Sequence, residues 1–135
     1  MIEMIEAYGT NITATQNMNV PFANKVVQTN YAIVKDSDNE TFELLMPGVY
    51  NVSFHGVATT TAAGDVSFQL LADGTVLPQT VVSATTGAGD IATVSFETNV
   101  RVAVAPMIQK AKLVVQYTGS AGTIDMADII IKKVR

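Results

Sequence analysis

Apolar and polar residues alternate along much of this chain, with the two-residue period of a β-strand that is buried on one face. The clearest alternation runs through residues 91–104, and others cover 49–58, 66–72 and 110–118. We expect one set of these side chains to point into a core. The predicted inward residues are Tyr50, Val52, Phe54, Ala58, Val66, Phe68, Leu70, Ala92, Val94, Phe96, Val100, Val102, Val104, Leu113, Val115 and Tyr117.

Turn-forming residues separate these stretches, and no long stretch shows the spacing of an amphipathic helix. Residues 25–34 and 40–45 add two further predicted strands. Asp73 and Gly74 predict a two-residue hairpin turn, because such turns need positive φ angles. Turn signals also occur at 36–40, 47–48, 59–65, 85–90, 104–106 and 118–123. Short strands and turns at this spacing predict an all-β sandwich or barrel.

The last stretch of the chain differs, because Ile129, Ile130 and Ile131 are consecutive and place apolar residues on both faces of a strand. Such a strand lies between two layers or has its outer face covered by another chain. Asp125 and Asp128 lie in the same stretch, and a buried carboxylate needs a partner. We expect either a contact across subunits or an exposed strand edge. The candidate cationic partners are Lys112, Lys132 and Arg101.

The beginning of the chain shows no clear strand pattern, so we expect residues 1–10 to form an N-terminal arm that attaches the protein elsewhere. Residues 11–135 then form one domain, because the whole length of 135 residues is typical of a single domain. The first residues include glutamates and no basic segment, so we expect no secretory signal. We expect the protein either to stay where it is made or to leave by lysis or inside a particle.

The composition indicates subunit contacts. Charged residues make up only 15% of the chain and apolar residues 48%, so charge alone does not cover the apolar surface. A net charge of −4 with scattered Lys and Arg residues argues against nucleic-acid binding. The lack of cysteine excludes disulfides and cysteine-ligated zinc. No apolar stretch reaches the roughly 20 residues of a membrane span.

Three successive stretches, residues 41–60, 68–83 and 113–134, resemble the trimeric jelly rolls of the tumour necrosis factor and complement globular-head type. They are most similar to short bacterial and phage versions, such as the C-terminal domain of exosporium collagen-like glycoproteins, although residues 1–135 contain no collagen-like Gly-X-Y stretch. The resemblance implies about ten short antiparallel strands in two sheets, and a homotrimer with the terminal strand near its axis. The trimer contacts it implies are Ile129, Ile131, Asp125, Tyr117 and His55.

His55 is the only histidine and the first candidate for chemistry. No nucleophile elbow and no second histidine accompany it, so we interpret it as a residue of the outer strand face or of a subunit contact, with a pH-sensitive contact as the alternative. Asp36, Asp38 and Glu40 alternate in a manner that suits Ca²⁺, but the glycine and glutamate of an EF-hand loop are absent. A polar hairpin loop is the simpler interpretation.

These features predict a non-enzymatic homotrimer without cofactors, serving as a structural piece of a bacteriophage virion: a head decoration, a head fibre or a tail-associated module. Its expected partners are its own copies and a capsid or tail protein bound through the arm, with no membrane or nucleic acid. The alternative is a receptor- or glycan-binding module on a phage, cell or spore surface, which uses loops 59–65, 85–90 and 118–123. A cupin-like enzyme would need more histidine and carboxylate ligands than one His allows.

Overall fold

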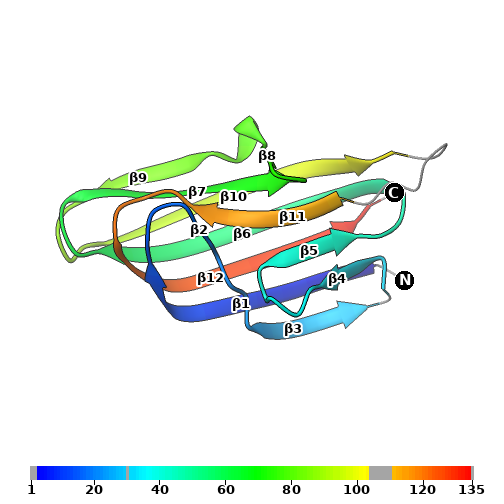
Figure 1. Cartoon of the computed structure of the whole chain (residues 1–135), viewed down its shortest axis with the longest axis horizontal. Coiled ribbons are helices and arrows are strands. Elements are labelled where there is room, and N and C mark those ends of the chain that lie inside the picture. Colours follow the sequence, from blue (N-terminus) through cyan, green and yellow to red (C-terminus); the bar gives the residue numbers. More distant parts are fainter. Residues whose placement is uncertain (1–2, 30, 104–110, 135) are drawn as a thin grey trace.

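The computed structural model describes residues 3–29, 31–103 and 111–134, and these residues form a sandwich of two antiparallel sheets (Figure 1). The only helical segment among them is η1 (Pro78–Thr80), so the described residues include no helix able to cross a membrane. The strands are β1 (Glu3–Ala14), β2 (Met18–Asn19), β3 (Asn24–Thr29), β4 (Ile33–Lys35), β5 (Thr41–Leu44), β6 (Gly48–Thr60), β7 (Gly64–Ala72), β8 (Thr75–Val76), β9 (Val82–Thr86), β10 (Ile91–Val102), β11 (Ala111–Tyr117) and β12 (Gly122–Lys133).

The two sheets differ in their strands. One sheet has five strands in the order β10-β6-β12-β1-β3, and four of these strands run for 12 or 13 residues. The other has seven strands, with the path β4-β5-β11-β7-β8, while β2 pairs with β11 and β9 with β7. The predicted all-β sandwich is therefore confirmed, although the described part of the chain has twelve strands rather than about ten, and several are long.

The core between the sheets consists of the side chains that the alternation predicted to point inward. All of those that the structure describes are buried, while Val104 lies outside the described residues. The five phenylalanines form one aromatic cluster centred on Phe54, whose ring lies 4.9 Å from Phe68, 5.2 Å from Phe96 and 6.3 Å from Phe22 between centroids. Aromatic pairs at these distances stabilise a core beyond the area they bury. Phe54 therefore joins the two sheets.

The turn predicted at Asp73 and Gly74 is confirmed. Their φ angles are 51° and 81°, the positive values that a two-residue hairpin turn requires, and they join β7 to β8. The strand predicted over 25–34 is wrong as one element, because it divides into β3 in the five-stranded sheet and β4 in the seven-stranded sheet. A stretch that crosses between sheets keeps its strand-forming composition, so the sequence pattern does not reveal the crossing.

The predicted N-terminal arm is wrong for residues 3–10. These residues belong to β1, which pairs with β12 on one side and with β3 on the other. Ile5 and Ala7 are fully buried in the core. Residues 3–10 therefore belong to the jelly roll, while residues 1 and 2 of the predicted arm lie outside the described residues.

Candidate functional site

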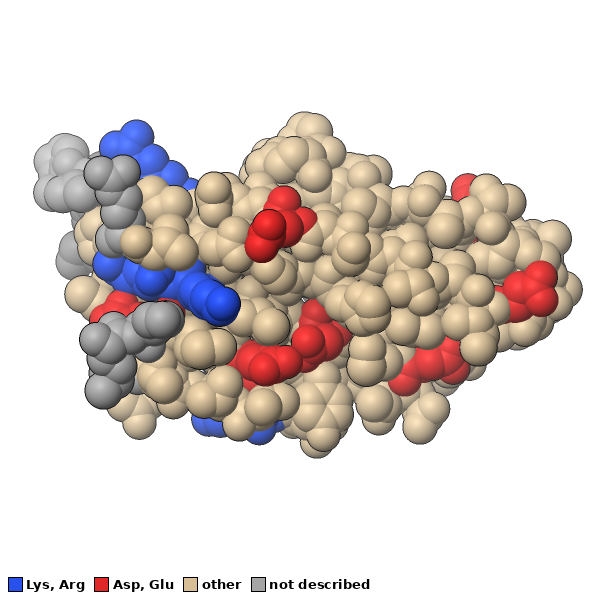
Figure 2. All heavy atoms as spheres, turned by 180° about the vertical axis from the view of Figure 1, so that it is seen from behind, with Lys and Arg blue, Asp and Glu red and all other residues tan. Residues whose placement is uncertain are grey.

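The outer face of the five-stranded sheet is the broadest surface built by long strands, and we call its outward side chains face A. They alternate along each strand with buried residues, and their partners across the sheet follow from the strand register. The central members of face A are Met4, Glu6, Tyr8, Ser53, His55, Val57, Met126, Asp128, Ile130 and Lys132. Figure 2 shows this face, with acidic side chains near its middle and toward the loop end, and basic ones mainly toward the end that carries the termini.

The middle of face A is a strip along β12 and β1. Ile130 on the central strand lies opposite Ser53 of β6 and Glu6 of β1. Its apolar neighbours Met126 and Tyr8 are, like Ile130, only half-buried, and none of the three packs against the core cluster. An apolar strip of this kind on an otherwise polar sheet is typical of a surface that another protein covers.

Two carboxyl groups interact inside this strip. Asp128 lies opposite Tyr8, and Glu6 occupies the next outward position along β1, so the two acids are diagonal neighbours across the β12–β1 ladder. Diagonal neighbours lie within reach of each other's side chains. Partial burial, a hydrogen bond from the Glu6 carboxyl and its negative charge raise the pKa of Asp128 to about 6. The carboxyl group of Asp128 therefore holds its proton to a higher pH than an isolated aspartate does.

His55 lies on the outward side of β6, exposed to solvent, with Asp128 opposite it on β12 and Ser95 opposite it on β10. This agrees with the predicted placement on the second face of the strand. Among the described residues, no group of three or more His, Cys, Asp or Glu side chains is arranged to hold a metal ion. His55 therefore belongs to face A together with the carboxyl pair.

Three residues predicted as trimer contacts lie elsewhere. Tyr117, Ile129 and Ile131 are fully buried inside the sandwich of a single chain, so their side chains belong to the core and are not available to a neighbouring subunit. The predicted terminal strand with apolar residues on both faces is confirmed as β12, the central strand of its sheet. Ile130, between the two buried isoleucines, is the residue that points outward.

Asp125 interrupts the ladder between β12 and β6. The register shifts between Ile124 and Met126, so Asp125 is the extra residue of a β-bulge. Its Oδ2 atom accepts a hydrogen bond of 2.7 Å from the hydroxyl of Thr59, and this bond supplies the partner that a half-buried carboxylate needs. The partner is a neutral hydroxyl rather than one of the predicted cationic residues.

The alternating acids at 36–40 form a turn between β4 and β5. The carboxylate of Asp38 accepts hydrogen bonds from the backbone N–H groups of Glu40 at 2.8 Å and Thr41 at 3.0 Å, and these bonds lower its pKa. Asp36 instead interacts with Glu43, whose hydrogen bond raises the pKa of Asp36 to about 6. Because the three acids point to different partners, the calcium interpretation of Asp36, Asp38 and Glu40 is not supported by this arrangement.

The loops 59–65, 85–90 and 118–123 meet at one end of the sandwich. The backbone N–H of Gly89 donates to Thr60 at 2.9 Å, and that of Thr61 donates to Ala121 at 3.1 Å. A hollow of about 340 Å³ opens beside them. Its lining residues are Gln16, Asp65, Thr118, Gly119, Ser120 and Ala121. This polar hollow offers hydroxyl and carboxylate groups but no aromatic platform.

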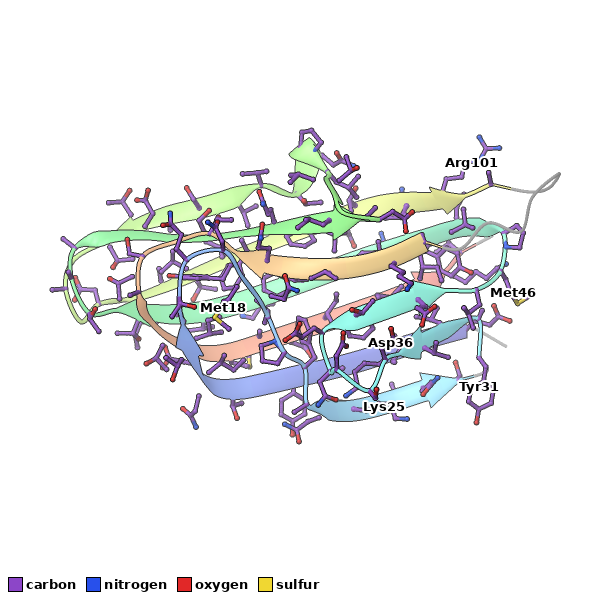
Figure 3. All side chains as sticks on the ribbon, in the orientation of Figure 1. Met18, Lys25, Tyr31, Asp36, Met46 and Arg101 are labelled. Atoms are coloured by element: carbon purple, nitrogen blue, oxygen red, sulfur yellow. The ribbon has the colours of Figure 1, made fainter. Side chains whose placement is uncertain are left out.

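The opposite end carries both termini and exposed apolar side chains (Figure 1). Tyr31 and Met46 project from it (Figure 3), with 77% and 47% of their surface exposed. Tyr31 follows β3, and Met46 lies in the turn between β5 and β6. The two ends of the sandwich therefore differ: one is polar and hollowed, and the other is apolar at its rim.

Sequence reasoning missed Glu6, Met4 and Tyr8, because it assigned them to an arm. The inward residues of β1 include Ala7 and Gly9, which are small, while the outward ones include Met4 and Tyr8, which are large and apolar. Ile5 is the one large buried side chain among residues 3–10, so the usual contrast between a large buried face and a polar outer face is weak along this part of the strand. The Glu6–Asp128 pair could not be recognised from the sequence pattern either, because the two residues lie 122 positions apart in the chain.

Known proteins resemble this chain in fold. No protein-family model and no curated protein sequence matches it. Among solved structures, the globular domain of zebrafish complement 1qA protein aligns with a TM-score of 0.70 at 14% identity, over 96% of this chain and 94% of that chain. The vertex protein P5 of PRD1 aligns with a TM-score of 0.60 at 12% identity, over 98% and 97%. The predicted jelly roll of the complement globular-head type is therefore confirmed as the fold.

Proposed function

We propose that this chain is a non-enzymatic structural protein that forms a homotrimeric jelly-roll module on a larger particle, as a bacteriophage head decoration, head fibre or tail-associated protein. The observation that carries the proposal is the apolar strip of face A, where Ile130, Met126 and Tyr8 lie on a sheet face that no described segment covers. Covering this strip with further copies removes apolar surface from water, at about 25 cal/mol per Å². The low content of charged residues supports the same arrangement.

The virion role is supported by the likeness to PRD1 vertex protein P5, which shares the fold over nearly the whole chain. We place the attachment at the end of the sandwich that carries both termini. Residues 3–10 are not proposed for this role, because β1 is held between β12 and β3. Tyr31 and Met46 supply exposed apolar contacts at that end. The particle-facing partner is a capsid or tail protein.

Particles purified from a lysate of the source organism test this role. Mass spectrometry should find the chain in a fixed ratio to the major capsid protein, and an antibody against the chain should label the particles in electron micrographs after a high-salt wash. A chain that is expressed but absent from washed particles would contradict the virion role without affecting the fold or the trimer.

The receptor- or glycan-binding role is the second candidate, and the polar hollow at the loop end favours it. Asp65 and Ser120 line a space open to solvent, and hydroxyl-rich ligands bind through such groups. A glycan array with the purified protein tests this candidate. Binding that Asp65→Asn removes, while Asp90→Asn in a neighbouring loop leaves it intact, would support a receptor role; an array without signal favours the purely structural one.

A further inference from the structure

Face A contains a feature that a simple packing surface does not need: an interacting pair of acids beside its apolar strip. We propose that the Glu6–Asp128 pair links assembly through face A to proton uptake, so that copies of this chain associate more tightly in mild acid than in mild alkali. This inference rests on the proposed trimer and adds its regulation. It concerns the side chains of face A on β12, β1 and β6.

The geometry places the pair inside the strip rather than at its margin. Asp128 lies two residues from Met126 on one side and two from Ile130 on the other, so apolar side chains flank it along β12. Glu6 lies directly opposite Ile130. A partner that covers Ile130 therefore also covers both carboxyl groups, and their removal from water disfavours the charged forms.

The groups that surround the pair determine the direction of the effect. Across from Asp128, β6 presents His55 and β1 presents Tyr8, while β3 places the uncharged Val27 opposite Glu6. Along β12, Lys132 lies four residues beyond Asp128. Further out, β10 presents Glu97, whose carboxylate accepts a hydrogen bond of 3.1 Å from Ser53 of β6.

Lowering the pH makes the charge around the Glu6–Asp128 pair less negative. Protonation of Asp128 removes a negative charge from the strip. In mild alkali each copy brings two ionised acids into a contact of low polarity, and their mutual repulsion and desolvation oppose association. The burial and the Glu6 hydrogen bond that raise the pKa of Asp128 to about 6 place this change in a range that purified protein tolerates.

The other sheet provides a matched control. Asp36 and Glu43 form a second carboxyl pair, for which a hydrogen bond also raises the pKa of Asp36 to about 6. This pair lies at the β4–β5 side of the seven-stranded sheet, and Lys112, opposite Glu43 on β11, acts against the shift. A change at Asp36 removes an equivalent titrating group without touching face A.

Sedimentation equilibrium of the full chain at about pH 5 and about pH 8, at one ionic strength, tests the link. For the wild type, the concentration at half-dissociation should rise at least about tenfold between the two conditions, which corresponds to a shift of one pKa unit. Asp128→Asn and Glu6→Gln should each reduce this dependence severalfold and associate at about pH 8 nearly as well as the wild type does at about pH 5. Asp36→Asn should keep the wild-type dependence.

The outcomes separate the inference from the trimer itself. A trimer whose dissociation does not change with pH, or an Asp128→Asn trimer that keeps the full dependence, would overturn the proton link and leave the proposed trimer intact. Loss of the dependence in His55→Gln but not in Asp128→Asn would overturn the assignment to the carboxyl pair. A monomer under both conditions would overturn the proposed trimer, and the proton link with it. Circular dichroism of each variant confirms that it is folded.

Discussion

The polar side chains on the outer faces of the two sheets have different partners. On the seven-stranded sheet, polar side chains bond to one another across strands, as Gln69 does to Gln116 at 2.6 Å and Ser67 to Thr118 at 2.7 Å. On face A, polar pairs such as Asn51–Asn99 occur along the β6–β10 side, whereas the β12–β1 strip carries apolar residues and acids. The outer face of the seven-stranded sheet also carries half-buried apolar residues, because Val114 and Val76 both lie opposite Leu71. The β12–β1 strip differs from them in the acids that lie among its apolar residues.

The largest effect is expected from charging the buried side of β12. Ile131→Asp places an unpaired carboxylate in the core, where such a charge costs about 3–5 kcal/mol or more out of a total stability of about 5–15 kcal/mol. Ile130→Asp changes the adjacent outward residue, so we expect the chain to stay folded and the assembly to be lost. Circular dichroism and sedimentation separate the two results. A folded Ile131→Asp protein, or a trimeric Ile130→Asp protein, would contradict the assignment of the two sides of this strand.

The second-largest effect is expected from removing a contact between the two sheets. Phe54→Ala removes the ring at the centre of the aromatic cluster and should lower the free energy of unfolding by about 3–5 kcal/mol, because the surrounding rings leave a cavity. Urea unfolding followed by tyrosine fluorescence measures the change. Val57→Ala alters the neighbouring outward side of the same sheet and serves as the control, with an expected change below about 1 kcal/mol.

The core of this fold could be predicted from the sequence, because alternation along β6, β7, β10 and β11 reports directly which side chains are buried. The first strand could not, because the small Ala7 and Gly9 follow Ile5 on its inner side while Met4 and Tyr8 point outward, which leaves little apolar contrast between the two sides. The prediction of which isoleucines point outward failed for a related reason. Three consecutive isoleucines establish that both faces are apolar, but the parity of inward and outward positions depends on the bulge at Asp125, which only the pairing with β6 reveals.

A smaller effect concerns the dependence of stability on pH. The pKa values of Asp36 and Asp128 are raised to about 6 in the folded chain from an ordinary value of 3.8. Their contribution to stability is therefore fully present below the ordinary value and is lost as pH rises through about 6. We expect unfolding in urea to need less denaturant at about pH 8 than at about pH 5, under conditions where the chain is monomeric.

Asp36→Asn and Asp128→Asn should each reduce this dependence of monomer stability on pH, and the double variant should reduce it further, because the two pairs lie on different sheets. Asp38→Asn should leave the dependence between about pH 5 and about pH 8 unchanged, since the hydrogen bonds that lower the pKa of Asp38 make a contribution to stability that is lost only as pH falls below the ordinary value. A double variant with the full wild-type dependence would show that other groups control it.

The smallest effect is expected on the outer face of the seven-stranded sheet. Gln116→Ala removes the 2.6 Å hydrogen bond to Gln69 and should cost about 1 kcal/mol of unfolding free energy, with no change in assembly. Thermal unfolding and sedimentation of the variant provide both quantities. Weakened association in Gln116→Ala would mean that copies meet through the seven-stranded sheet and not through face A.

In the proposed trimer several copies cover the β12–β1 strip, and the mass of the oligomer in solution tests this most directly. Multi-angle light scattering of the purified full chain at about pH 5 should return the mass of three 14.3-kDa chains, and Ile130→Asp should return the mass of one. A wild-type chain with the mass of a single copy under the same conditions would contradict the account, as would an Ile130→Asp protein that retains the mass of three.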